Sequence, residues 1–127
     1  MTKAYTNIEQ SKQLAEILPI ESADMRYHTI SKYNPYPCDE IVYTIYFGNP
    51  SGDDIPCWSL AALRNCLPSG ISIDGILYVF ESHNTFDNEW VYEYKFEDIS
   101  APLYSKSSNE IDACSKMIIK LNELKML

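Results

Sequence analysis

The sequence is poor in the residues on which most cofactor and metal chemistry depends. Only four of its 127 residues are glycine, and none falls in a GxGxxG, GxxxxGKS or GxSxG pattern. The two histidines, His28 and His83, lie at no metal-ligand spacing from a cysteine or from each other. We therefore expect no cofactor, no metal and no catalytic residue. A cysteine–histidine nucleophile pair stays open, because such partners are distant in sequence.

Cations are also few. Ten Lys and Arg residues stand against eighteen Asp and Glu residues, which gives a net charge of −8. Nucleic-acid interfaces require clustered cations, and so do polybasic contacts with a membrane surface. We therefore expect neither direct nucleic-acid binding nor membrane binding.

Long apolar runs and cysteine pairs are missing as well. No stretch approaches the roughly 18 apolar residues of a membrane span, and residues 1–7 have no apolar signal core. No two of the four cysteines form a CxxC pair; they are Cys38, Cys57, Cys66 and Cys114. The expectation is a reduced, cytoplasmic protein in which the cysteines pack as small apolar side chains.

The length and composition are those of a single globular domain over residues 1–127. Apolar residues make up 46% of the chain and charged residues 22%. A chain of this size buries about two-thirds of its unfolded surface, which is enough for a core without metal or disulfide crosslinks.

Three helices are predicted from capping and breaking residues. The first opens with the capping-box pattern of residues 6–9, in which Thr6 caps, and it ends before Pro19. The second opens at Pro56 and ends before Pro68. The third is capped by residues 107–110 and reaches the C-terminus. Its apolar stripe consists of Ile111, Cys114, Ile118, Leu121 and Leu124.

Between the helices, apolar residues recur with a period of two, which predicts strands. These cover residues 25–31, 41–47, 76–81 and 90–96. Asp74-Gly75 is a two-residue hairpin signal that joins a further short strand, 71–73, to the strand at 76–81. Residues 99–106 are expected to connect the last strand to the last helix.

A weak internal repeat has an offset of 49 residues. Residues 40–47 and 89–96 share four identities in eight positions, and a Leu-Pro pair follows each of the first two helices. Both a duplication, of 6–47 into 55–96, and chance similarity between β-rich segments explain the match. In either case the predicted fold is α+β, with two helix–strand–strand units plus a C-terminal helix. We expect an antiparallel sheet of four to five strands with helices on one face.

The acidic residues are concentrated in the middle of the chain. Residues 51–100 hold nine acidic and two basic residues, a net charge of −7. Asp53 and Asp54 precede the second predicted helix, while Glu93 and Glu97 belong to the last predicted strand pair. Such a face attracts a basic partner or imitates a nucleic-acid backbone. The simpler interpretation, which we favour, is a solvated surface that maintains solubility.

Aromatic residues are the other excess, with ten tyrosines and two tryptophans. Tyr33 and Tyr36 lie in a predicted loop, where tyrosine provides large contact area at low entropic cost. Trp58 is predicted in the first turn of the second helix, where it either stacks on a ligand or fills the core. The candidate binding residues are therefore Trp58, Asp53, Asp54, Tyr33, Tyr36, Glu93 and Glu97.

Three segments carry a resemblance to known sequences. They are LPIESADM at 18–25, IPCWSLAAL at 55–63 and IDACSKMIIKL at 111–121. Together they resemble a group of short uncharacterised proteins encoded by phages and mobile elements of gut anaerobic bacteria. The resemblance implies a genomic setting and no reaction. It maps shared residues onto Glu21, Asp24, Pro56, Trp58, Ser59, Asp112 and Met117, while Arg64 and Asn65 interrupt an expected apolar run.

These observations predict a non-catalytic accessory protein of a phage or mobile element that binds a host or phage protein. Inhibition of a host defence component and attachment to a virion both fit, in the host cytoplasm or on the particle. The alternative is a protein that binds or sequesters a small, nucleotide-like ligand. A small enzyme is the third hypothesis.

Overall fold

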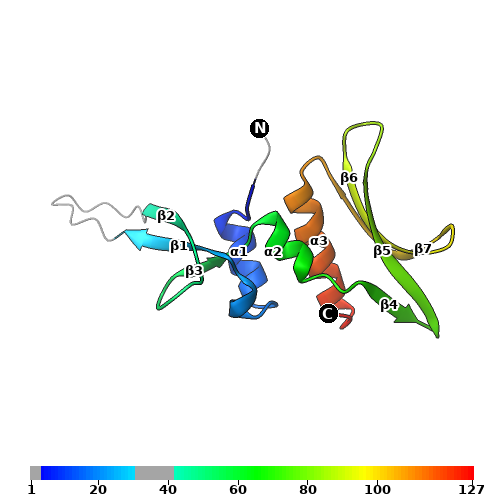
Figure 1. The fold of residues 1–127 in the computed structure, drawn as a ribbon, viewed down its shortest axis with the longest axis horizontal. Helices are drawn as coiled ribbons and strands as arrows, with labels where there is room; N and C mark the ends of the chain where they lie inside the picture. Colours follow the sequence, from blue (N-terminus) through cyan, green and yellow to red (C-terminus); the bar gives the residue numbers. More distant parts are fainter. Residues whose placement is uncertain (1–3, 31–41) are drawn as a thin grey trace.

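The computed structural model describes residues 4–30 and 42–127, which form three α-helices, one 3-10 helix and two antiparallel sheets (Figure 1). The elements are α1 (Ile8–Ala15), η1 (Ile20–Ser22), β1 (Met25–Ile30), β2 (Val42–Phe47), β3 (Ile55–Cys57), α2 (Leu60–Asn65), β4 (Gly70–Ile73), β5 (Ile76–Asn84), β6 (Trp90–Phe96), β7 (Ile99–Ser107) and α3 (Glu110–Glu123). The predicted α+β class, the antiparallel pairing and the C-terminal helix are confirmed.

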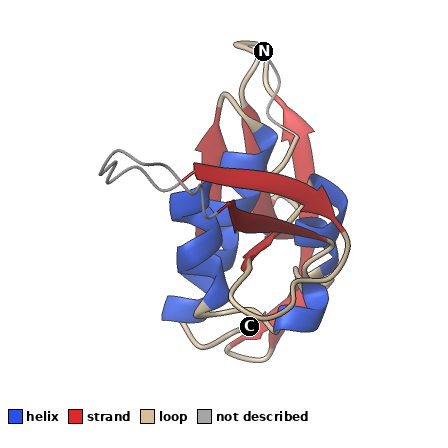
Figure 2. Ribbon diagram, turned by 90° about the vertical axis from the view of Figure 1, so that its left-hand side faces the viewer, coloured by secondary structure: helices blue, strands red, loops and turns tan. Residues whose placement is uncertain are grey.

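The described strands divide between a three-stranded sheet, ordered β2-β1-β3, and a four-stranded sheet, ordered β4-β5-β6-β7. The helices lie between the two sheets (Figures 1 and 2). Helix α3 packs on β6 and β7, α2 packs on α3, and α1 packs on β3. The four-stranded sheet thus has helices on one face, as expected, whereas the sequence did not indicate that β1, β2 and β3 form a sheet of their own.

The main core lies between the helices and the four-stranded sheet. Tyr92 and Tyr94 of β6 are fully buried against α3 and α2. The predicted stripe of α3 is buried at Ile111, Cys114, Ile118 and Leu121, whereas Leu124 follows the end of the helix and is half exposed. A smaller cluster of Met25, Tyr27 and Cys57 lies under the three-stranded sheet.

Helix α1 begins one residue later than predicted. Asn7, not Thr6, is the N-cap, and the side chain of Gln10 completes the capping box. Thr6 is fully buried, and its hydroxyl accepts a hydrogen bond from the backbone N–H of Trp58 at 3.2 Å. The hydroxyl is therefore engaged with a distant segment and does not cap the helix.

Helix α2 also begins later than predicted, because Pro56 belongs to β3 and not to the helix. Ser59 is the N-cap, and its hydroxyl accepts from the N–H of Ala62. Strand β3 is an edge strand, in which the missing N–H of a proline is tolerated. The expected position of Trp58 in the first helical turn is therefore wrong.

Strand β7 occupies the segment that was expected to be a connection. It pairs with β6, with a register shift between Glu93 and Lys95. A proline in the sequence of this segment argues against a central strand, and β7 is an edge strand. The hairpin between β4 and β5 is confirmed: Asp74 and Gly75 have φ values of +52° and +81°, as in a type I′ turn.

The internal repeat stays a prediction. Helix α1 is followed by β1 and β2, whereas α2 is followed by β4, β5 and β6.

Replacing Ile118 by alanine is expected to lower the free energy of unfolding by about 2–5 kcal/mol, because a fully buried side chain leaves a cavity. Leu124→Ala, at the half-exposed end of the same apolar stripe, is the matched control and should cost less than about 0.5 kcal/mol. Urea denaturation measures both. Equal losses in the two variants would contradict the burial of α3 described above.

Candidate functional site

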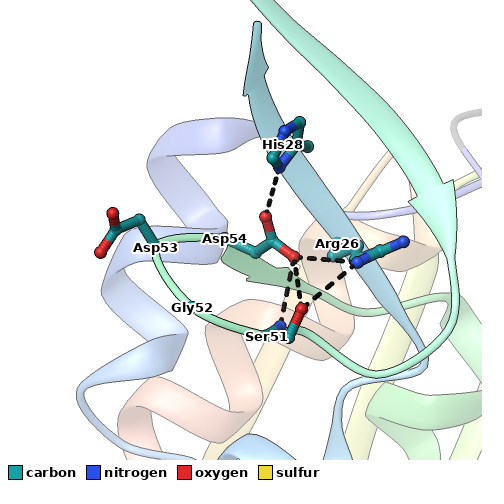
Figure 3. Close-up of a pocket in the computed structure, with 6 residues that line it drawn as sticks. All are labelled: Arg26, His28, Ser51, Gly52, Asp53 and Asp54. Carbon is teal, nitrogen blue, oxygen red and sulfur yellow. Dashed lines mark hydrogen bonds and ion pairs between the residues drawn. The ribbon is translucent and has the colours of Figure 1, made fainter.

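The loop between β2 and β3 folds onto β1 and places Asp54 beside two basic side chains (Figure 3). Asp54 Oδ1 accepts a hydrogen bond from His28 Nδ1 at 2.7 Å, and Oδ2 accepts one from Arg26 Nη1 at 3.1 Å. The backbone N–H of Ser51 also donates to Oδ2, at 3.2 Å. Only 4% of the Asp54 side chain is exposed, so this carboxylate is a shared acceptor that fastens the loop to β1.

These contacts lower the pKa of Asp54. The hydrogen bond from His28 is the largest cause, and the Ser51 N–H and the Arg26 guanidinium act in the same direction. Partial burial opposes them, because it disfavours the charged form. The net result is a carboxylate that stays ionised to more acidic pH than an ordinary aspartate.

The same side chains surround a hollow of about 270 Å³, lined by Arg26, His28, Ser51, Gly52, Asp53 and Asp54. On β2, Tyr46 adds a ring whose centroid lies 5.3 Å from the Arg26 guanidinium carbon. Arg26 Nη1 and His28 Nδ1 are both hydrogen-bonded to Asp54, whose carboxylate offsets positive charge in the hollow. Asp53 is exposed in the same loop. We interpret the cluster as an ion-pair network that stabilises the loop.

Trp58, the predicted stacking residue, lies in the main core. Its side chain is fully buried, and its Nε1 donates to Ser22 Oγ at 3.0 Å. An enclosed indole has no face free for a ligand, so the structure favours the core-filling interpretation of this residue.

The other predicted binding residues are dispersed. Glu93 is only 8% exposed, and its Oε1 lies 3.4 Å from Lys95 Nζ. Glu97 is exposed in the turn between β6 and β7. Tyr33 and Tyr36 lie outside the described residues.

The acidic residues of the segment 51–100 therefore do not form one face. Asp53 and Asp54 belong to the three-stranded sheet, whereas Glu93 and Glu97 belong to the four-stranded sheet on the other side of the helices (Figure 1). Several of these carboxylates are paired with cations, including Glu89 with Lys106 at 3.2 Å.

A second feature, which the sequence did not indicate, is an exposed apolar surface at one end of the four-stranded sheet. Here β4 and the start of β5 extend beyond the helices (Figure 1). The apolar sheet end consists of five exposed side chains, distributed over both faces of the sheet: Ile76, Leu77, Val79, Phe96 and Ile99. Leu77 and Val79 lie on the face away from the main core, whereas Ile76, Phe96 and Ile99 lie on the opposite face. Leu77, Val79 and Ile99 are each more than half exposed. Such gathering of apolar side chains is typical of an interaction surface.

Carboxylates border the apolar sheet end. Asp74 lies in the turn between β4 and β5, and Glu97 and Asp98 form the turn between β6 and β7. In an antiparallel sheet of this order both turns lie at the same end. All three residues are exposed, and none forms an ion pair with another residue of the described part of the chain. The border is therefore negative and free to meet cations.

One signal in the sequence could have indicated this surface. Residues 76–80, ILYVF, are apolar on both faces of the strand. A strand of this kind is either buried on both sides or exposes one apolar face. Which of these two arrangements occurs depends on how far the helices extend over the sheet. The local sequence of the strand does not determine this.

The cysteines of the described residues are weak candidates for a nucleophile. Cys57, Cys66 and Cys114 are free thiols, and burial is the main cause that raises the pKa of each. The pKa of Cys114 rises to about 12. Because the thiolate is the reactive form, these three thiols are poorly reactive near neutral pH.

Within residues 4–30 and 42–127, no three His, Cys, Asp or Glu side chains are grouped so that they could hold a metal ion. None of the helices in this part of the chain combines the length and the apolar character that crossing a bilayer requires.

Comparisons of the chain with protein-family models, with curated proteins and with solved structures found no match.

Asp54→Asn is expected to reduce stability at pH 7, because it removes the acceptor shared by His28 and Arg26. The folded-state pKa of Asp54 is lowered, so its contribution is fully present above the unfolded pKa of about 3.9 and is lost as the pH falls below it. The difference in denaturation midpoint between wild type and variant should therefore be largest at pH 7, smaller at pH 4 and smallest at pH 2.5.

Asp53→Asn is the control for this measurement, because Asp53 is the exposed neighbour in the same loop. It should have little effect at any of these pH values. A stability difference for Asp54→Asn that grows as the pH falls would contradict the ion-pair network.

Proposed function

We propose that this chain is a non-catalytic accessory protein that acts by binding another protein through the apolar sheet end. The observation that carries the proposal is the exposure of five large apolar side chains on a segment of sheet that the helices leave uncovered. Exposing such side chains costs solubility unless a partner covers them, and buried apolar anchors provide most of the energy of protein interfaces.

The charged border indicates the chemistry of the partner. Asp74, Glu97 and Asp98 are exposed and have no cation of this part of the chain beside them. A partner with an apolar patch bordered by lysine or arginine would satisfy both the apolar and the acidic groups. Two copies of this chain facing each other here would instead bring the same carboxylates together.

The resemblance to phage and mobile-element proteins is the reason to expect a host or phage protein as partner. Under this proposal the chain acts in the cytoplasm of the host cell or on the virion. Inhibition of a host defence component and a minor virion role are both forms of the same binding function.

The test is capture of a partner by the tagged chain from infected or carrier cells at low salt, read by native mass spectrometry. Ile99→Ser should weaken binding of the captured protein by about tenfold or more, because it removes an exposed apolar anchor. Phe86→Ser is the matched control, since Phe86 is fully exposed in the turn at the opposite end of the same sheet.

Two charge-reversal variants measure how much the acidic border of the apolar sheet end contributes to binding. Glu97→Lys should weaken the complex and reduce its sensitivity to salt, whereas Asp87→Lys, in the opposite turn, should leave both unchanged. Equal effects of the variants at the two ends, or no captured protein at all, would overturn the proposal.

A second candidate function, the binding of a small nucleotide-like ligand, is favoured by a groove beside α2. Two adjoining hollows of about 380 and 450 Å³ share Ser22, Asn65 and Cys66 in their walls. Each volume is within the range of ligand pockets, about 300–1,000 Å³.

For this second function, calorimetric titration with adenine and guanine nucleotides should detect binding that Ala61→Trp abolishes, because Ala61 is an exposed residue in the wall of the smaller hollow. Absence of any heat, or binding that survives this substitution, would exclude the groove as the site.

A further inference from the structure

The two edge strands of the four-stranded sheet, β4 and β7, differ in whether side chains of the protein contact their outward-facing backbone groups. On β7, the carbonyl oxygens of Tyr104 and Lys106 accept hydrogen bonds from the ammonium groups of Lys120 and Lys116, which reach across from α3. Charged lysine groups placed over a sheet edge disfavour pairing with another strand. The β7 edge is therefore covered at Tyr104 and Lys106.

The β4 edge has no such cover. Among the described residues no strand pairs with its outer side, and no side chain is hydrogen-bonded to its outward groups. Phe80 N–H donates to Ser69 O at 3.0 Å. Because backbone groups along a strand point alternately to either side, this bond defines which residues of β4 direct theirs toward β5 and which direct theirs outward. Ile71 therefore bonds inward to β5, and the backbone groups of Gly70 and Ser72 point outward. These two residues present two donors and two acceptors to an added strand.

Leu77 extends the apolar sheet end to this edge. A Cβ atom on Gly70 would lie 3.1 Å from Leu77 Cδ1, so the leucine side chain lies across β4 at the glycine. Leu77 is 59% exposed. On the other face of the sheet, Ile73 and Ile76 lie opposite each other in the β4–β5 pair. A strand added to β4 would thus find apolar contacts on both of its faces.

We propose that the partner binds by adding an extended segment as a fifth strand beside β4, an inference that rests on the proposed function. Its main-chain groups pair with Gly70 and Ser72, and its alternating apolar side chains contact Leu77 on one face and Ile73 on the other. A lysine or arginine of the segment pairs with Asp74 at the turn.

The charge of the chain favours such a basic segment over a second copy of the same chain. Two copies would each bring a net charge of −8, whereas a basic segment is attracted over long range. Asp74 is exposed at the end of β4 and has no ion pair within the described residues.

Ser72→Pro tests strand addition directly. Proline removes the outward N–H and places its ring on the open edge, while the inward hydrogen bonds of Ile71 and Ile73 to β5 are retained. Binding of the protein captured by the wild-type chain should weaken by about tenfold or more. Ser72→Ala keeps the N–H and should bind as wild type.

Amide hydrogen exchange of the wild-type chain gives a second measurement that does not depend on how the proline variant folds. The amides of Gly70 and Ser72 should exchange rapidly in the free protein and slowly in the complex, while that of Ile71 is protected in both.

The outcomes separate this inference from the proposed function. If Ile99→Ser weakens the complex but Ser72→Pro does not, and both outward amides stay unprotected, the surface is correct and strand addition is overturned. If the wild-type chain captures no protein, both proposals fall. A homodimer in native mass spectra that Ser72→Pro abolishes would show that the occupant is a second copy.

Discussion

The fold depends on the buried hydrogen bonds of Thr6, which tie the start of the chain to the segment between β3 and α2. Its N–H donates to Trp58 O at 3.0 Å, its hydroxyl accepts from Trp58 N–H, and its carbonyl accepts from Tyr27 OH at 2.7 Å. Ser11 Oγ lies 2.7 Å from the same hydroxyl. One residue thus joins α1, β1 and the entry to α2, and it links the three-stranded sheet to the main core.

A neighbouring polar contact extends this junction to the second helix. Asp24 accepts hydrogen bonds from both the N–H and the hydroxyl of Ser59, the N-cap of α2. The contact explains why a residue just before β1 matters for a helix whose N-cap lies 35 residues later. With Trp58 enclosed beside it, the junction gives Asp24, Trp58 and Ser59 structural roles.

The sequence pattern correctly predicted the elements that depend on interactions between residues close together in the chain. The apolar stripe of α3, its cap at Asn109 and the Asp74-Gly75 hairpin each depend on neighbours in sequence. The division into two sheets does not, because it follows from which strands pair over long distances. The pairing of Asp54 with Arg26 and His28 likewise spans 28 and 26 residues. The sequence therefore did not indicate that Asp54 of the acidic loop is paired with basic side chains of β1.

The unequal edges of the four-stranded sheet have a consequence for stoichiometry. A sheet with two open edges can continue to add strands on both sides, which leads to fibres. Here the ammonium groups of Lys116 and Lys120 occupy two outward carbonyl groups of β7, so this edge is less open to a further strand than the β4 edge. Head-to-tail stacking of the sheet, with β4 of one copy beside β7 of the next, is therefore disfavoured.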